Sequence, residues 1–235
     1  MEMKKLLVPL CALAVSSVAF AQQPKAGTVS IIPRVGVSLA NLPGDEILTG
    51  DAEMPYSPRY KAGFMGGVDV DYQFLPNLSA SIGAYYVQQG CRYDNGTTEI
   101  DGQQSQYVGY SDWSTQLHYL NVPLLFNAYI GTGFAVKTGV QLGFALSGKM
   151  KYTEMEYTRT DEDVVYGKPV DREVSLNKAL SNVTLAIPVG VSYEFSNVII
   201  DARYNIGLTG YGDIHGFKTS KNSVFCFSAA YRFAL

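Results

Sequence analysis

Cysteine, histidine and tryptophan are scarce in this sequence, with three, two and one of each among 235 residues. Cys11 lies in the apolar N-terminal stretch without the preceding small residue typical of lipoprotein signals, so we expect no lipid anchor. Cys91 and Cys226 are too few for a disulfide scaffold. Whether these two form a single bridge depends on a geometry that the sequence leaves open.

A long apolar run is missing after residue 21, and so is any marked excess of charge. Without such a run no helix can cross a membrane, so a membrane-embedded chain would have to cross as strands. The formal net charge is −3, and it becomes −4 without Glu2, Lys4 and Lys5, which leaves 16 basic and 20 acidic residues. That balance is too mild to indicate a nucleic acid or an acidic partner.

The N-terminus has the features of a secretory signal peptide. Lys4 and Lys5 precede an apolar stretch over 6–20, and Ala19-Phe20-Ala21 is a small-x-small cleavage site. An uncleaved anchor is the alternative, but no charged stop-transfer flank follows the stretch. The predicted organisation is a cleaved signal peptide over 1–21, a short N-terminal lead over 22–28 and one domain over 29–235.

Strand-like alternation of apolar and polar residues recurs eight times, and no helical periodicity of comparable length competes with it. Successive side chains of a strand point to opposite faces, so each stretch has one bulky apolar face and one small or polar face. The eight predicted strands cover 29–40, 61–74, 78–86, 120–127, 134–147, 182–195, 198–208 and 225–235.

Short and long connections alternate between these strands. Turn-forming residues at 76–77, 131–133 and 196–197 predict tight hairpins, whereas the other connections are long, roughly 41–59, 92–114, 149–180 and 209–222. An even number of strands with short turns at one end and long loops at the other is typical of outer-membrane barrels. The predicted fold is all-β, an eight-stranded antiparallel up-and-down transmembrane β-barrel with short periplasmic turns and long extracellular loops.

The composition of the two faces separates a membrane barrel from a soluble ligand-binding barrel such as a lipocalin. The polar face is mostly Gly, Ser, Ala and Asn with isolated charges, which suits the crowded interior of eight strands. The other face carries bulky apolar side chains with almost no charge, as lipid contact requires. Aromatic residues near the short turns predict a girdle at the membrane edge: Tyr72, Phe74, Phe126, Phe134, Tyr193, Phe195, Tyr231 and Phe233.

Eight charged residues fall on the predicted inner face, four of each sign. Uncompensated charges are costly in so narrow a lumen, so we expect them to pair. They would form either a salt-bridged plug, which the narrow interior favours, or an ion path. The residues are Arg34, Asp69, Asp71, Lys137, Glu194, Asp201, Arg203 and Arg232.

Two prolines, Pro123 and Pro188, fall at inward positions of predicted internal strands. Proline lacks the N–H group that a ladder hydrogen bond needs. We therefore expect a β-bulge at each of them.

The sequence carries no recognisable motif for catalysis, cofactor binding or a metal. His118 and His215 lie toward the loop end without a partner motif. Acidic residues at 154, 156 and 161–163 lack the spaced oxygen ligands of a calcium loop, so we expect them in a solvated loop. We expect neither an enzyme nor a cofactor.

Three phrases carry a family resemblance: KAGFMGGVDVDYQF at 61–74, LHYLNVPLLFNAYI at 117–130 and VIIDARYNIGLTG at 198–210. Together with the alternation, they make the chain from Val29 to Leu235 resemble the outer-membrane β-barrel domain family abundant in Bacteroidetes, called porin-like or PorT-like. The most specific part is Tyr-Leu-x-x-Pro-Leu-Leu at 119–125. More distantly the chain is similar to small OmpX and OmpA-type barrels.

The resemblance implies that the last strand is read by the outer-membrane barrel-assembly machinery, usually through a final Phe. Leu235 takes that place here, with Phe227, Tyr231 and Phe233 in phase before it.

The resulting hypothesis places the protein in the cell outer membrane, in contact with its lipid. There it would be a structural barrel that displays four loops to an unidentified extracellular partner. A narrow porin-like channel for ions or small solutes is the alternative, and a soluble ligand-binding barrel is a third. The sequence identifies neither a solute nor a surface partner.

Overall fold

The computed structural model describes residues 25–42, 58–100, 105–160, 163–214, 217–218 and 221–235, which form strands, turns and connecting segments. The predicted signal peptide over 1–21 lies outside the described residues. Within those residues, no helix has the length and apolar character needed to span a membrane.

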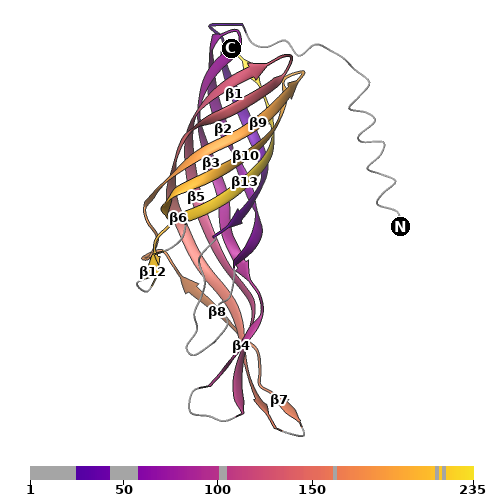
Figure 1. The fold of residues 1–235 in the computed structure, drawn as a ribbon, viewed down its shortest axis with the longest axis vertical. Coiled ribbons are helices and arrows are strands. Elements are labelled where there is room, and N and C mark those ends of the chain that lie inside the picture. The colour runs from indigo at the N-terminus through magenta and orange to yellow at the C-terminus, as the bar shows by residue number, and fades with distance from the viewer. Residues whose placement is uncertain (1–24, 43–57, 101–104, 161–162, 215–216, 219–220) are drawn as a thin grey trace, which may run out of the picture.

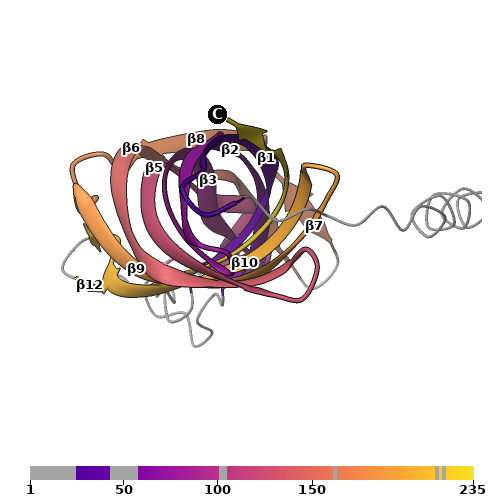
Figure 2. The same cartoon turned by 90° about the horizontal axis from the view of Figure 1, so that it is seen from above.

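Eight strands form a closed antiparallel barrel (Figures 1 and 2). Each strand pairs with the next one in the ring, and the last strand pairs with the first, with Val37 opposite Phe227. The eight-stranded fold predicted from the alternation is therefore confirmed. In ring order the strands are β1 (Val29–Asn41), β2 (Pro58–Leu75), β3 (Leu78–Tyr93), β5 (Gln106–Ile130), β6 (Phe134–Arg159), β9 (Val183–Phe195), β10 (Val198–Gly210) and β13 (Lys221–Tyr231).

Three tight turns join strands at one end of the barrel, at the predicted positions 76–77, 131–133 and 196–197. Gly131 and Gly133 have φ angles of 65° and 85°, in the left-handed region that glycine adopts without strain. The chain also ends here, in the short strand β14 (Phe233–Ala234), which pairs with β1 (Figure 1). We call this end the short-turn end.

Two of the predicted long loops are largely strand. β5 and β6 contain 25 and 26 residues and run beyond the ring, where β4 (Gly96–Glu99), β7 (Val164–Tyr166) and β8 (Val170–Ser175) join them (Figure 1). We call these three strands, with residues 106–111 of β5 and 149–159 of β6, the projecting sheet. A separate hairpin pairs β11 (Asp213–Ile214) with β12 (Phe217–Lys218).

The prediction of a solvated loop was therefore wrong for Glu154 and Glu156, which lie in β6 opposite Tyr110 and Val108. The projecting sheet has no ring around it, so both of its faces can carry polar side chains. The apolar alternation that revealed the barrel strands is consequently weak here, and cross-strand pairing holds the segment extended.

The two faces of the barrel wall differ as the alternation predicted. Inward side chains are buried, whereas outward ones such as Val35, Phe126 and Ile200 expose 55–58% of their surface. So broad an apolar belt would be an aggregation hazard in water and is typical of a surface in contact with lipid. The aromatic residues predicted near the short turns face outward too, all exposed except the half-buried Phe195.

Pro123 and Pro188 point inward as expected, but neither produces a β-bulge, so that prediction was wrong. Each proline interrupts the ladder toward one neighbouring strand, where the register places Gly83 opposite Pro123 and Gly139 opposite Pro188. The register is the same on both sides of each gap, and the other edge stays paired. A strand residue directs its N–H group to one neighbour only, so a proline removes bonding on one side and leaves the other intact.

Candidate functional site: the barrel interior and its cap

Asp201 of β10 is the centre of a buried charge cluster inside the barrel. Its carboxylate lies 2.9 Å from Lys137 Nζ, 3.5 Å from Arg34 Nη1 and 3.4 Å from Arg203 Nη2. These cations come from β6, β1 and β10, so one carboxylate links strands on different sides of the ring. All four side chains are buried.

A second carboxylate, Asp69 of β2, extends this cluster. Arg34 Nη2 lies 3.2 Å from Asp69 Oδ2, and its Nη1 donates to Ser228 Oγ at 3.0 Å. The Tyr85 hydroxyl donates to the other oxygen of Asp69, and the Arg203 guanidinium lies 5.7 Å from the centre of the Tyr85 ring. The cluster thus combines ion pairs, neutral hydrogen bonds and a cation–π contact.

Arg232 organises a second cluster near the short-turn end. Its Nε donates to Glu194 Oε1 at 2.9 Å, its Nη1 to Asp71 Oδ1 at 2.9 Å and its Nη2 to the Tyr129 hydroxyl at 2.9 Å. Asp71 also accepts hydrogen bonds from Ser79 Oγ at 2.7 Å and from Asn127 Nδ2 at 3.0 Å. One guanidinium therefore links the end of the chain to β2, β5 and β9.

The eight charged residues expected inside the barrel all lie there, and each makes at least one ion pair with another member of the set. The four positive and four negative charges balance. Removing one partner of such a buried pair typically costs about 3–5 kcal/mol, because the other charge stays buried and uncompensated. These ion pairs connect strands on opposite sides of the lumen.

An apolar cluster covers the other end of the lumen, where the long connections begin. Its members come from the wall strands and from segments that follow β1, β8 and β10, so distant parts of the chain meet over the opening. We call this cluster the cap, and its buried members are Leu42, Cys91, Tyr93, Trp113, Leu117, Tyr119, Leu176 and Tyr211.

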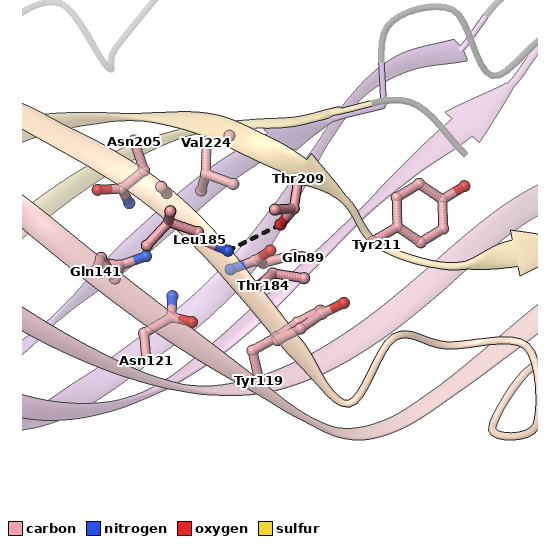
Figure 3. Close-up of a pocket in the computed structure, with 12 residues that line it drawn as sticks. Gln89, Tyr119, Asn121, Gln141, Thr184, Leu185, Asn205, Thr209, Tyr211 and Val224 are labelled. Carbon is pink, nitrogen blue, oxygen red and sulfur yellow. Dashed lines mark hydrogen bonds between the residues drawn. The ribbon is translucent and has the colours of Figure 1, made fainter. Parts of the chain in front are cut away.

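A small polar cavity of about 30 Å³ lies inside the barrel beside the cap (Figure 3). Asn121, Gln141 and Asn205 line it from three strands, and Tyr119 and Tyr211 of the cap border it. Asn121 Nδ2, Asn205 Oδ1 and the Tyr119 hydroxyl are buried without a hydrogen-bond partner within the described part of the chain. A polar cavity of this size can hold water, which would satisfy such groups.

The inner-face charges were predicted from the sequence, but their hydrogen bonds to neutral side chains and the cap were not. Strand alternation places Ser79 and Asn127 on the inner face, and the same alternation could have added Tyr85 and Tyr129. No alternation in the sequence indicated the cap, because Leu42, Leu176 and Tyr211 lie in irregular segments.

The predicted assembly signal lies on the outer wall. Phe227, Tyr231, Phe233 and Leu235 are all exposed, and Phe233 pairs with Ile31 of β1. The ladder between β1 and the last strand lacks pairs at Ile32 and Pro33, which is where β13 ends and β14 begins.

Other reactive side chains have structural surroundings. Tyr86 Oη and His118 Nδ1 are hydrogen-bonded at 2.6 Å, and His215 lies outside the described residues. Cys91 and Cys226 are buried and no disulfide joins them, which answers the open question of a bridge. Among the residues that the structure describes, no group of His, Cys, Asp and Glu could hold a metal.

The solved structures to which the chain is similar include three bacterial outer-membrane proteins. Ail of Yersinia pestis, in a complex with a heparin analogue, has 16% identity and a TM-score of 0.43, over 88% of this chain and 99% of that one. OprG of Pseudomonas aeruginosa has 13% identity and a TM-score of 0.39, over 90% and 98%. E. coli outer membrane protein W has 15% identity and a TM-score of 0.34, over 89% of this chain and 99% of that one. No curated protein matches the chain.

A family model described as "Outer membrane protein beta-barrel domain" matches residues 20–211, which is most of the chain. The match agrees with the closed ring of eight antiparallel strands, the apolar outer belt and the polar interior. The chain therefore belongs to the outer membrane protein beta-barrel domain family and is an integral β-barrel protein of the outer membrane.

Proposed function

We propose that this protein is a surface-interaction barrel: a closed, plugged cylinder that holds the projecting sheet outside the cell. The observation that carries the proposal is the extension of β5 and β6 far beyond the ring, where β4, β7 and β8 widen them into a sheet. A rigid scaffold that supports extended connections is the usual arrangement for binding at a surface. In this orientation the short turns face the periplasm and the cap faces outward.

The closed interior supports this function over transport. A solute would have to pass the cap, then the Asp201 cluster and then the Arg232 cluster, each of which fills the lumen with packed or ion-paired side chains. Eight strands leave an interior that side chains can fill. The small polar cavity favours the second candidate, a narrow channel for ions or small solutes, because it is an interior space lined by hydrogen-bonding groups.

The finer assignments rest on the sequence. The phrases at 61–74, 117–130 and 198–210 support a porin-like or PorT-like barrel of the Bacteroidetes type. The N-terminal stretch supports export through a signal peptide cleaved after Ala21. The aromatic phase of the last strand supports recognition by the barrel-assembly machinery, and the absence of a catalytic motif supports a non-enzymatic role.

Planar-bilayer recording of the purified, refolded barrel tests the proposal. We expect no discrete conductance steps from the wild-type protein. A variant with an opened cap, Leu176→Ala with Tyr211→Ala, tests whether the charge clusters alone keep the lumen closed, and we expect it to stay silent as well. Reproducible ohmic steps from the wild-type barrel would contradict the plugged interior and favour the channel.

A further inference from the structure

A groove of about 620 Å³ crosses one face of the projecting sheet. Strand register places two rows of side chains on this face. Glu99, Tyr107, Tyr157 and Tyr166 are neighbours across four strands, and Thr97, Gly109 and Met155 form the next row. Directly paired residues of antiparallel strands project from the same face, so these rows form one continuous surface.

A bulge separates this surface from the cap. The β5–β6 register shifts between Ser111 and Ser114, and Asp112 there has a φ angle of 52°. On the cap side of the sheet, Tyr110 packs 5.5 Å from the Trp113 ring. Tyr107, Gly109 and Ser111 alternate with Tyr110 and therefore face the other way. Most of the groove lining lies on the face that the cap does not cover, and Tyr110 borders the groove from the cap side.

Two tyrosine rings, those of Tyr157 and Tyr166, line the groove, and Tyr107 extends the row beyond it. Tyr107 and Tyr157 are stacked at 5.3 Å with an interplanar angle of 18°, and Tyr166 follows 5.7 Å from Tyr157. Rings held by one another lose little conformational entropy when a ligand binds, which makes such a surface preorganised. Tyr166 is 63% exposed, so the row is open to a partner.

Gly109 forms the floor of the groove. A Cβ atom placed there would have its nearest neighbours at 3.6 Å from Met155 and 3.8 Å from Tyr157, which is ordinary van der Waals contact. The backbone thus has room for a side chain, and its absence makes the depression. A β-branched residue at this position would fill the floor and suit the strand.

The composition of the groove points to a protein partner. Tyrosine, methionine and arginine are enriched in the cores of protein interfaces, whereas Lys, Asp and Glu are depleted there. Among the described residues, the groove lining contains Tyr157, Tyr166, Met155 and Arg159 and no Lys, Asp or Glu, while Glu99 lies on the same face outside this lining. A neighbouring depression of about 480 Å³, by contrast, is lined by several charges of both signs, as on a hydrated rim.

Arg159 supplies the charge of the groove. It is exposed, and its guanidinium makes no ion pair within the described residues. An acidic side chain of a partner could therefore bind it. A guanidinium binds a carboxylate through two parallel hydrogen bonds, so this contact would also orient the partner.

We propose that the groove binds an extended segment of a partner protein, with an apolar or aromatic side chain over Gly109 and an acidic side chain at Arg159. The inference rests on the proposed surface-interaction function and assigns it a place and a partner chemistry. Glycans, which can also stack on tyrosine, are the competing class.

A random-peptide display library, selected on the refolded full-length barrel, is the test. We expect enrichment of peptides that combine an aromatic with an acidic residue. Gly109→Val should weaken their binding by about tenfold or more, as expected for the centre of an interface. Val108→Thr, one residue away on the opposite face, should leave binding unchanged. Selection on Arg159→Glu should enrich a basic residue in place of the acidic one.

Three results would overturn the inference. One is a selection that yields no enriched peptide, and another is binding that Gly109→Val leaves unchanged. The third is Gly109-dependent binding to an array of free oligosaccharides without any peptide binding. A heat-modifiable gel shift equal to that of wild type shows that each variant is folded. The conductance test is independent of all three outcomes, so a failure of the groove and a failure of the plugged-barrel function can be distinguished.

Discussion

At the scale of single residues, the interior of the barrel concentrates stability in a few carboxylates. Asp201 compensates three cations, and Asp71 and Glu194 share Arg232. Pairs on the projecting sheet, such as Arg172 with Glu154 at 2.5 Å, are exposed to water, which screens their attraction. Ion pairs of similar geometry therefore contribute much more to stability inside the barrel than on the projecting sheet.

Asp201→Ala is expected to lower the free energy of unfolding by about 3–5 kcal/mol, because it leaves Arg34, Lys137 and Arg203 without a shared anion. Urea unfolding of the refolded barrel, followed by the fluorescence of the single tryptophan Trp113, measures the change. Adding Lys137→Met should recover part of the loss by removing one surplus cation. Arg172→Gln is the exposed control, and a loss there as large as at Asp201 would contradict the distinction.

At the scale of strands, the sequence predicted elements wherever one face meets lipid and the other meets the lumen. In β9 and β10 this contrast gives strict alternation, and the predicted ranges end within two residues of the observed ones. In the outer part of β6, from Lys149 to Arg159, water reaches both faces and the pattern fails. The bulge at Asp112 also reverses the parity of β5, which no sequence rule indicated.

The attachment of β8 should depend on pH through Glu173. A hydrogen bond from Lys151, with a further contribution from Lys149, holds the pKa of Glu173 below its ordinary value of 4.5. A carboxyl whose pKa is lowered by folding contributes stability above 4.5, and this contribution is lost as the pH falls through the lowered pKa. We expect β8 to loosen in that acid range.

Hydrogen exchange of the β8 amides, corrected for the intrinsic pH dependence of exchange, measures this effect. Protection relative to β9 should fall below pH 4.5 in the wild-type protein. Glu173→Gln should show the reduced protection at every pH. Equal protection of β8 in the wild type on both sides of that range would contradict the role of Glu173.

At the scale of the whole molecule, the barrel has two unlike ends. The short-turn end holds the C-terminus and the aromatic belt, and the other end holds the cap and the projecting sheet (Figure 1). Alternation and turn residues predicted the closed ring and its charges. They could not predict the cap, because its packing joins segments that are far apart in the sequence and have no common pattern.

The proposed orientation predicts which end a membrane-impermeant maleimide reaches in intact cells. Lys168→Cys, in the exposed segment between β7 and β8, should be labelled without lysis. Asn77→Cys, in an exposed short turn, should be labelled only after lysis. Cys91 and Cys226 are buried and give a low background. The reverse pattern would show that the projecting sheet faces the periplasm.

The last strand should determine how much of the protein reaches the membrane as a closed barrel. Phe233 is 52% exposed on the outer wall, its ring lies 4.8 Å from that of Tyr231, and it pairs with Ile31 to close the ring. Phe233→Asp places a charge against lipid, at a cost of up to a few kcal/mol that is smallest near the interface. It also interrupts the series of aromatic residues at alternate positions that is proposed as the assembly signal. Phe233→Tyr keeps both the ring and the interface preference. The ratio of folded to unfolded bands in outer-membrane fractions should therefore fall for Phe233→Asp and stay near that of wild type for Phe233→Tyr. Equal ratios for the two variants would show that Phe233 neither faces lipid nor is recognised during assembly.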